Sequence, residues 1–365
     1  MIEMNESTLF KKVFGCIIGG AIGDALGASV ENCHYKQIQE TYGILQEFVP
    51  PFKGERRGVR IFPPGKNPPW RSHLPFHPLP FGIDGFQVGN GRYTDDMQGR
   101  LLNYLAIIKY GRRITIQERD KFVRQYALEN LNHTDKIRRE WARYTLTTLV
   151  TPTGKRPVFG VNWGSPGGVI NAGNPKAGAE DGGPLGAAVA EAFKLEATAD
   201  SVIKAALDYA YSYDYEYGRS MLGINRISEM FYRRALWVLD LAEKVNDVFE
   251  IRKYIYGDDP VNTFLVAYPP WHFVYPLEMF PTALAMIKIA KGDPWTAILG
   301  GANFGRDCDS IACMAGEIAG ALKGIDALPN HMVKAVQEVN PDPDMKEIAE
   351  KLTYIILQNQ ENSER

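Results

Sequence analysis

Apolar residues recur along most of this chain at the three-and-four spacing of a buried helix face, and alternating stretches typical of strands are few. The spacing predicts helices over the ranges 10–31, 101–108, 116–150 (as two helices), 187–197, 201–211, 219–245, 248–256, 282–291, 294–299 and 311–322. A last amphipathic helix is predicted at about 343–358, after which the chain should fray. The pattern indicates a mostly α protein.

Two of these predicted helices carry a small residue at every fourth position. The two small-residue ridges consist of Gly15, Gly19, Gly23 and Gly27 in the first helix, and of Ala312, Gly316 and Gly320 in the second. A mid-helix glycine costs about 1 kcal/mol relative to alanine, so the repeats indicate that another backbone approaches closely. We expect the two ridges to pack together, which joins the first and last thirds of the chain in one compact domain over 1–365.

Hard oxygen ligands gather at two of the predicted helix starts. Asp307, Asp309 and Ser310 lead into the helix 311–322, and Thr94, Asp95 and Asp96 lead into the helical run over 101–108. The unpaired N–H groups of a helix start favour negative charge, and ordinary capping residues produce the same pattern at a single start. Two such starts in one chain are harder to explain by capping. With waters, they offer enough oxygen ligands for one or two magnesium-sized cations.

Asp24 and Glu31 form an acidic pair on the glycine-bearing helix predicted at 10–31. The two residues are seven positions apart, so both would project from nearly the same face if the helix continues. Carboxylates seldom lie among apolar residues without a partner, so we expect a functional role for at least one of the two.

A segment at about 48–92 is rich in proline, glycine and aromatic residues. Its prolines exclude a long helix, and it exceeds the length of an ordinary connection, so we expect a loop-rich insertion. The insertion could be a lid or wall that contacts a ligand, or an ordered loop packed on its own rings. The glycine-dense segment 153–186 likewise has two interpretations, a loop that contacts a ligand or a plain connector. It has neither a P-loop ending nor a dinucleotide-binding fingerprint that would identify a ligand.

Composition and charge narrow the choice of partners. The 365 residues carry a formal net charge of -2, with 45% hydrophobic and 23% charged residues, which is ordinary for a soluble globular protein. No cluster of lysine and arginine favours nucleic acid, and the apolar run from Val13 to Ile22 is too short to span a membrane. Without a basic leader segment, a cytoplasmic location is expected. The four cysteines lack disulfide or zinc spacing and are expected to be apolar filler.

Together, three motifs resemble the ADP-ribosylglycohydrolase family, also called the dinitrogenase-reductase-activating glycohydrolase family. They are Gly23–Glu31 (Gly-Asp-Ala-Leu-Gly-Ala-Ser-Val-Glu), Thr94-Asp95-Asp96 and Gly305–Ser310 (Gly-Arg-Asp-Cys-Asp-Ser). The resemblance implies an all-α fold, a compact single-domain orthogonal helical bundle with a central cleft that holds two metal ions. Met97 stands where many members have a threonine, and Ser310 replaces the commoner threonine while keeping the hydroxyl.

The same resemblance implies roles for individual residues. The metal would be magnesium, with manganese possible, and its ligands would be Thr94, Asp95, Asp96, Asp307, Asp309 and Ser310. Glu31 matches a glutamate that in some family members lies over the substrate ribose and is implicated in catalysis.

The resulting hypothesis is magnesium-dependent hydrolysis of the glycosidic bond at ribose C1 of an ADP-ribosylated substrate, through an oxocarbenium-like transition state. Glu31, Asp95 or Asp309 could be the general base. The nearest alternative keeps this chemistry and acts on a small free riboside, nucleoside or nucleotide. A non-catalytic, crystallin-like member is a further alternative, against which the retention of every expected ligand argues, and a metal-dependent phosphohydrolase is the last.

Overall fold

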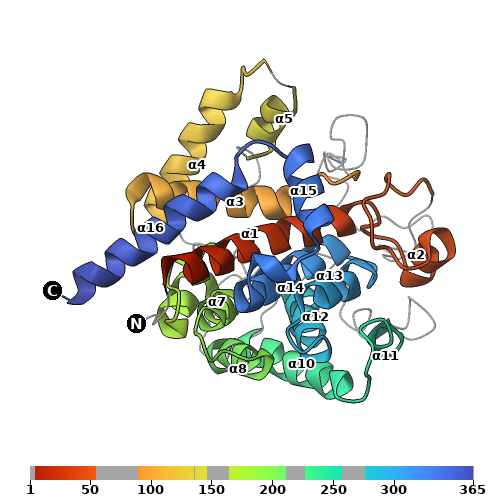
Figure 1. Cartoon of the computed structure of the whole chain (residues 1–365). Coiled ribbons are helices and arrows are strands. Elements are labelled where there is room, and N and C mark those ends of the chain that lie inside the picture. Colours follow the sequence, from red (N-terminus) through yellow and green to blue (C-terminus); the bar gives the residue numbers. More distant parts are fainter. Residues whose placement is uncertain are drawn as a thin grey trace.

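Two buried helices, α1 (Glu6–Ala28) and α14 (Cys308–Lys323), cross at the centre of the protein (Figure 1). The structure is a computed structural model, which describes residues 5–54, 89–134, 136–145, 164–210, 227–256 and 276–364. Within these ranges the protein is all-α and contains no strand, which confirms the expected fold class. No helix in the described ranges is long and apolar enough to cross a membrane.

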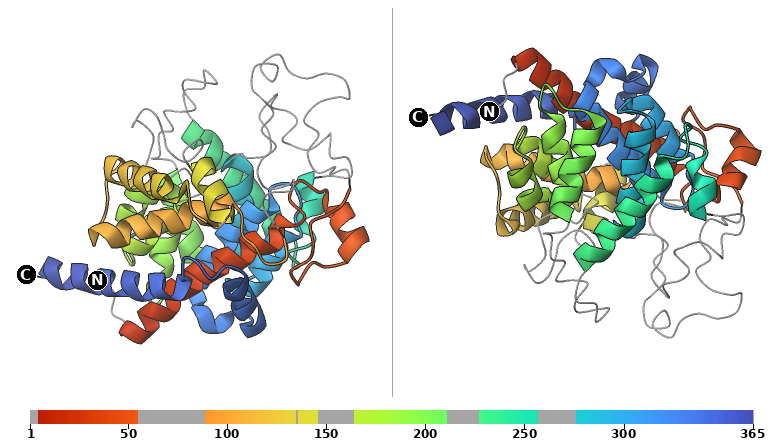
Figure 2. Two further views of the ribbon diagram at one scale, coloured as in Figure 1. Left: turned by 90° about the horizontal axis from the view of Figure 1, so that it is seen from above. Right: turned by 90° about the horizontal axis from the view of Figure 1, so that it is seen from below.

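The remaining helices surround this central pair. In chain order they are α2 (Tyr35–Tyr42), α3 (Asp95–Tyr110), α4 (Ile116–Asn130), α5 (Lys136–Tyr144), α6 (Ser165–Ile170), α7 (Pro175–Ala192), α8 (Ala199–Ala210), α10 (Ile227–Ala242), α11 (Ile251–Tyr256), α12 (Pro276–Ile289), α13 (Pro294–Ala302), α15 (Asn330–Val339) and α16 (Met345–Glu364). Helices α12 and α13 pack on α14, and α16 packs on α1 and α3 (Figure 2). Helix α7 packs on α14 and also contacts α6 and α8.

The small-residue ridges of α1 and α14 pack directly against each other, as the fourfold spacing predicted. A Cβ atom added at Gly19 would overlap the carbonyl of Gly316, and one added at Gly15 would lie 2.5 Å from the Gly320 carbonyl oxygen. Partners later in α1 fall earlier in α14, so the two helices run antiparallel. The C-terminal end of α1 therefore lies beside the N-terminal end of α14.

The glycine-dense segment differs from the loop that the sequence led us to expect. Its described part, from Gly164 onward, forms α6 and α7, with non-helical backbone only at Gly183 (φ 61°) inside α7. A Cβ atom at Gly167 would lie 2.8 Å from the Gly182 backbone nitrogen. The glycines of this part therefore allow two helices to pack closely instead of forming a long loop.

Two differences in helix ends concern the acidic pair and the end of the chain. Helix α1 ends at Ala28, so Glu31 lies beyond the helix and does not share a helical face with Asp24. Helix α16 continues to Glu364, past the predicted end at 358, because no glycine or proline interrupts its last turns. Most of the proline-rich insertion at about 48–92 lies outside the described residues, as does 153–163 of the glycine-dense segment.

Replacing Gly19 by alanine tests the backbone contact between α1 and α14. Alanine normally stabilises a helix, but at Gly19 its Cβ would overlap the Gly316 carbonyl, and backbone cannot move aside cheaply. We expect Gly19→Ala to lower the free energy of unfolding by about 3 kcal/mol or more, measured by urea denaturation. Ser7→Ala, at an exposed position of α1, is the matched control and should change it by less than about 0.5 kcal/mol. A Gly19→Ala protein as stable as the wild type would contradict the described crossing.

Candidate functional site

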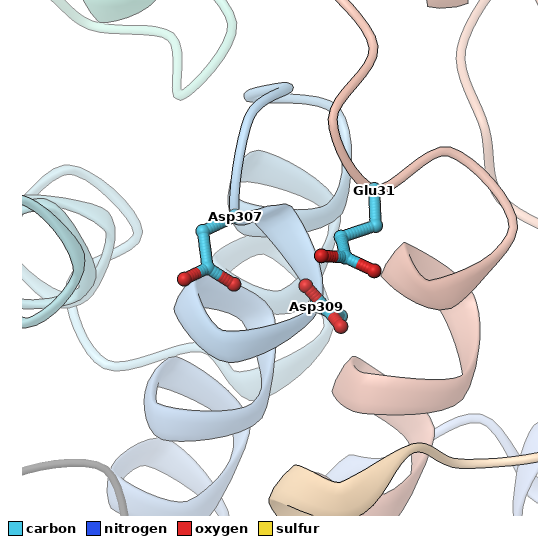
Figure 3. Close-up of side chains that lie close together, drawn as sticks. All are labelled: Glu31, Asp307 and Asp309. Atoms are coloured by element: carbon cyan, nitrogen blue, oxygen red, sulfur yellow. The ribbon is translucent and has the colours of Figure 1, made fainter. Parts of the chain in front are cut away.

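Three carboxylates meet where the end of α1 lies beside the start of α14. Glu31, Asp307 and Asp309 each offer one oxygen, and these oxygens all lie within 4.8 Å of one another (Figure 3). Asp307 and Asp309 are 4% and 3% exposed, whereas Glu31 is partly exposed. We call these three residues the acidic group.

Backbone contacts join the two segments that carry the acidic group. Asn32 N–H donates to the Arg306 carbonyl at 2.6 Å, and Arg306 N–H donates to the Cys33 carbonyl at 2.8 Å. Gly27 allows this approach, because a Cβ atom there would lie 2.5 Å from the Asp309 Cα. The antiparallel crossing of α1 and α14 thus places Glu31 against the turn that contains Asp307.

That turn has a left-handed backbone held by a buried ion pair. Gly305 has φ 84° and Arg306 has φ 59°, a conformation that is unfavourable for an arginine. The Arg306 guanidinium lies against Glu278 of α12, with Nε 2.5 Å from Oε1 and Nη2 3.1 Å from Oε2. This bidentate pair stabilises the strained residue immediately before Asp307. The sequence showed Arg306 within the motif, but no local signal pointed to Glu278.

The second oxygen-rich start, at α3, is fixed by Asp24 of α1. The fully buried Asp24 carboxylate accepts hydrogen bonds from Thr94 N–H at 3.0 Å and Met97 N–H at 2.8 Å. Asp24 therefore caps α3 and sets the position of the turn that carries Thr94 and Asp96. Of the acidic pair singled out in the sequence, Asp24 has this positioning role, and Glu31 belongs to the acidic group.

A hydrogen bond joins the two helix starts. Ser310 Oγ donates to Asp96 Oδ2 at 2.5 Å, and Asp96 is 7% exposed. The buried Thr94 hydroxyl accepts from Asp96 N–H at 3.2 Å. Asp95 is partly exposed in the first turn of α3, and it does not belong to the acidic group. The structure therefore brings Asp96 and Ser310 together, whereas Asp95 is partly exposed.

The acidic group is electrostatically unfavourable without a cation. Burial raises the pKa of Asp307, and repulsion from Asp96 and Glu31 raises it further. Burial likewise raises the pKa of Asp309, with repulsion from Glu31 and Asp307 adding to the effect. Asp307 Oδ2 and Asp309 Oδ1 are buried and have no hydrogen-bond partner among the described residues. Buried carboxylate oxygens of this kind fit a hard divalent cation, which prefers oxygen ligands.

The described start of the insertion lies next to this site. Ser29 Oγ donates to the Val49 carbonyl at 2.6 Å, and Phe52 N–H donates to the Ser29 carbonyl at 2.8 Å. On the far side of the insertion, Asn90 N–H donates to the same Val49 carbonyl at 3.0 Å. The described residues on both sides of the insertion therefore lie near the end of α1, at Ser29, which is two residues before Glu31.

A model of the ADP-ribosylglycohydrolase family matches residues 5–363. This chain belongs to the ADP-ribosylglycohydrolase family. The family is one of metal-dependent hydrolases, and the acidic group is a set of oxygen ligands that could hold a metal ion.

Two individual proteins are also similar to this chain, one in sequence and one in structure. An uncharacterized protein of Escherichia coli K12, YegU, is 36% identical over 64 residues, which is 18% of this chain and 19% of that protein. A solved structure described as an ADP-ribosylglycohydrolase-related protein complex is 20% identical, covers 96% of this chain and 99% of its own, and gives a TM-score of 0.40. The stretch shared with YegU is thus about a fifth of either protein.

Replacing Asp307 by asparagine tests whether repulsion within the acidic group destabilises the protein without metal. The change removes the carboxylate that repels Glu31 and Asp309 when it is ionised. In EDTA the free energy of unfolding should therefore rise by about 1 kcal/mol, seen as a higher melting temperature. The stabilisation by added Mg²⁺ should shrink at the same time, because a ligand is lost. Differential scanning calorimetry with and without Mg²⁺ measures both. The exposed Asp240→Asn is the control and should change neither; a lower melting temperature for Asp307→Asn in EDTA would refute the repulsion.

Proposed function

We propose that this chain is a magnesium-dependent hydrolase that cleaves the glycosidic bond at ribose C1 of ADP-ribosylated substrates. The observation that carries the proposal is the acidic group, whose oxygens lie within 4.8 Å of one another at the start of α14. The Ser310–Asp96 hydrogen bond places the second helix start beside it. The family match runs from 5 to 363, which supports a single catalytic domain over 1–365.

The proposed metal ligands come from the two helix starts. They are Thr94, Asp95, Asp96, Asp307, Asp309 and Ser310, which would hold two Mg²⁺ ions, with Mn²⁺ able to replace them. The buried oxygens of Asp307 and Asp309 that have no hydrogen-bond partner support this set. When bound, the ions would stabilise negative charge and make a nearby water more acidic.

Glu31 is the general base that we favour among Glu31, Asp95 and Asp309. A base must reach both water and substrate, and Glu31 is the member of the acidic group that is partly exposed, whereas Asp309 is 3% exposed. Asn32 Nδ2 donates to Glu31 Oε1 at 3.0 Å, which orients the carboxylate. Glu31 would accept the proton of the attacking water as the bond to the leaving group breaks through an oxocarbenium-like transition state.

Product analysis tests the reaction and the substrate class together. The protein is incubated with Mg²⁺ and, separately, with ADP-ribosyl-arginine, ADP-ribosyl-serine peptides, ADP-ribose and nucleosides, and products are identified by mass spectrometry. We expect free ADP-ribose from an ADP-ribosylated amino acid, lost in EDTA and restored by Mg²⁺. Asp307→Ala/Asp309→Ala should abolish the reaction, whereas Asp208→Ala/Asp240→Ala, two exposed carboxylates, should leave it unchanged.

Other products would change the proposed reaction or substrate. Release of a base from a small riboside would keep the chemistry and change the substrate, and release of phosphate would replace the glycosidase with a phosphohydrolase. Turnover that survives exhaustive chelation would refute the metal-dependent mechanism.

Replacing Glu31 by glutamine separates a base from a ligand. The amide keeps the shape of the side chain but cannot accept the proton, so kcat should fall about 10²–10⁴-fold. Because Glu31 is not among the proposed ligands, the Mn²⁺ affinity measured by isothermal titration calorimetry should change less than about threefold, whereas Asp309→Asn should weaken it by about tenfold or more. Equal losses of Mn²⁺ affinity in both variants would show that Glu31 is a ligand.

A further inference from the structure

Arg100 is a fully buried cation one helical turn after Asp96 in α3. Its Nη1 donates to the Asp96 carbonyl at 2.6 Å and lies 3.4 Å from Asp96 Oδ1. Its Nε lies 2.8 Å from Glu317 Oε1 in α14. A buried guanidinium without a partner costs several kcal/mol, so these two carboxylates determine where Arg100 lies.

Glu317 is itself held from three sides. It is fully buried, and Ser165 Oγ at the start of α6 donates to its Oε1 at 2.5 Å. Its side chain passes α1 at Gly20, where an added Cβ atom would lie 2.6 Å from Glu317 Cγ. Glu317 is thus a fixed anchor for Arg100, built from α14, α6 and α1.

The Asp96 carboxylate has a different partner at each oxygen. Ser310 Oγ donates to Oδ2 at 2.5 Å, and Arg100 Nη1 is the cation nearest Oδ1 in the described contacts. The last side-chain torsion of an aspartate has broad energy minima, so the carboxylate plane turns easily. Partners on both oxygens are therefore needed to fix this plane. Ser310 comes from α14 and Arg100 from α3 itself, so the plane is set relative to both helices.

We propose that Arg100 is a positioning residue, which Glu317 holds in place and which orients the Asp96 carboxylate for metal binding. The inference rests on the proposed function and adds to it a residue outside the ligand set. Lysine could not replace Arg100, because a single ammonium cannot lie beside both Asp96 and Glu317 as the planar guanidinium does.

The test measures the affinity for Mn²⁺ alone, by electron paramagnetic resonance, and the melting temperature in EDTA. Arg100→Met leaves Glu317 as an unpaired buried charge, so we expect a lower melting temperature and about 10–100-fold weaker Mn²⁺ binding. Arg100→Met/Glu317→Met removes both charges, so the melting temperature should recover while the Mn²⁺ affinity stays weak. Arg100→Lys keeps the charge beside Glu317 and should weaken Mn²⁺ binding by about tenfold, which tests the inference even if the methionine variants do not fold.

Two controls separate positioning from packing. Arg119 is also buried, at 3% exposed, and its Nε donates to Asn103 Oδ1 at 3.0 Å, at a residue seven positions after Asp96 in α3. Arg119→Met should lose stability and keep the wild-type Mn²⁺ affinity. If Arg100 acts through Asp96, adding Arg100→Met/Glu317→Met to Asp96→Asn should weaken Mn²⁺ binding less than about twofold further.

The possible failures are distinct. Wild-type protein that binds no Mn²⁺ would overturn the proposed function and this inference with it. Wild-type binding that is unchanged in Arg100→Lys and in Arg100→Met/Glu317→Met would overturn the positioning role of Arg100 alone. Additive losses with Asp96→Asn would also overturn it, because Arg100 would then act by another route.

Discussion

The close backbone contact between α1 and α14 is the constraint on which the site depends. Small residues at every fourth position let the two helices approach until added Cβ atoms would overlap the opposite backbone. A shift of the register by one residue would bring larger side chains into the contact, so the observed antiparallel register, which keeps small residues opposite each other, is favoured over it. In that register the chain leaves α1 at Ala28 beside the start of α14 at Cys308. The meeting of Glu31 with Asp307 follows from this helix crossing.

Helix α1 also positions the other half of the site. Asp24 accepts the N–H groups of Thr94 and Met97, so the start of α3 is fixed to the same helix whose end presents Glu31. Ser310 then joins α14 to Asp96 of α3. Each candidate ligand is therefore held relative to one rigid helix, which is the arrangement that metal sites need for defined geometry.

The sequence predicted the features that have a local cause. Mid-helix glycines are unfavourable unless something requires them, so the ridges could be recognised, and the oxygen-rich helix starts could be recognised from Asp307 and Thr94. The family resemblance was confirmed by the match over 5–363. The individual metal and catalytic roles stay predictions.

Features that depend on distant partners could not be predicted. The pairing of Arg306 with Glu278 joins residues from different helices, and no sequence pattern relates them. Lys12 is a similar case, since it lies in an apolar stretch and its Nζ donates to the Ala192 carbonyl at 2.7 Å and the Leu322 carbonyl at 3.0 Å, near the ends of two other helices. Helix α6 and the first half of α7 were missed because their glycines matched a loop composition, and the close packing of the two helices explains these glycines.

The charges around the site fit the binding of a cation. The two buried arginines nearest to it, Arg100 and Arg306, are each held by a glutamate from another helix, Glu317 and Glu278. Neither arginine pairs with Asp307 or Asp309, whose buried oxygens therefore keep their negative potential. An arginine able to rotate into the acidic group would neutralise it and fill the place of a metal. Holding both guanidiniums in fixed pairs preserves an unbalanced group of carboxylates, and binding a divalent cation would then relieve the repulsion that folding alone leaves in place.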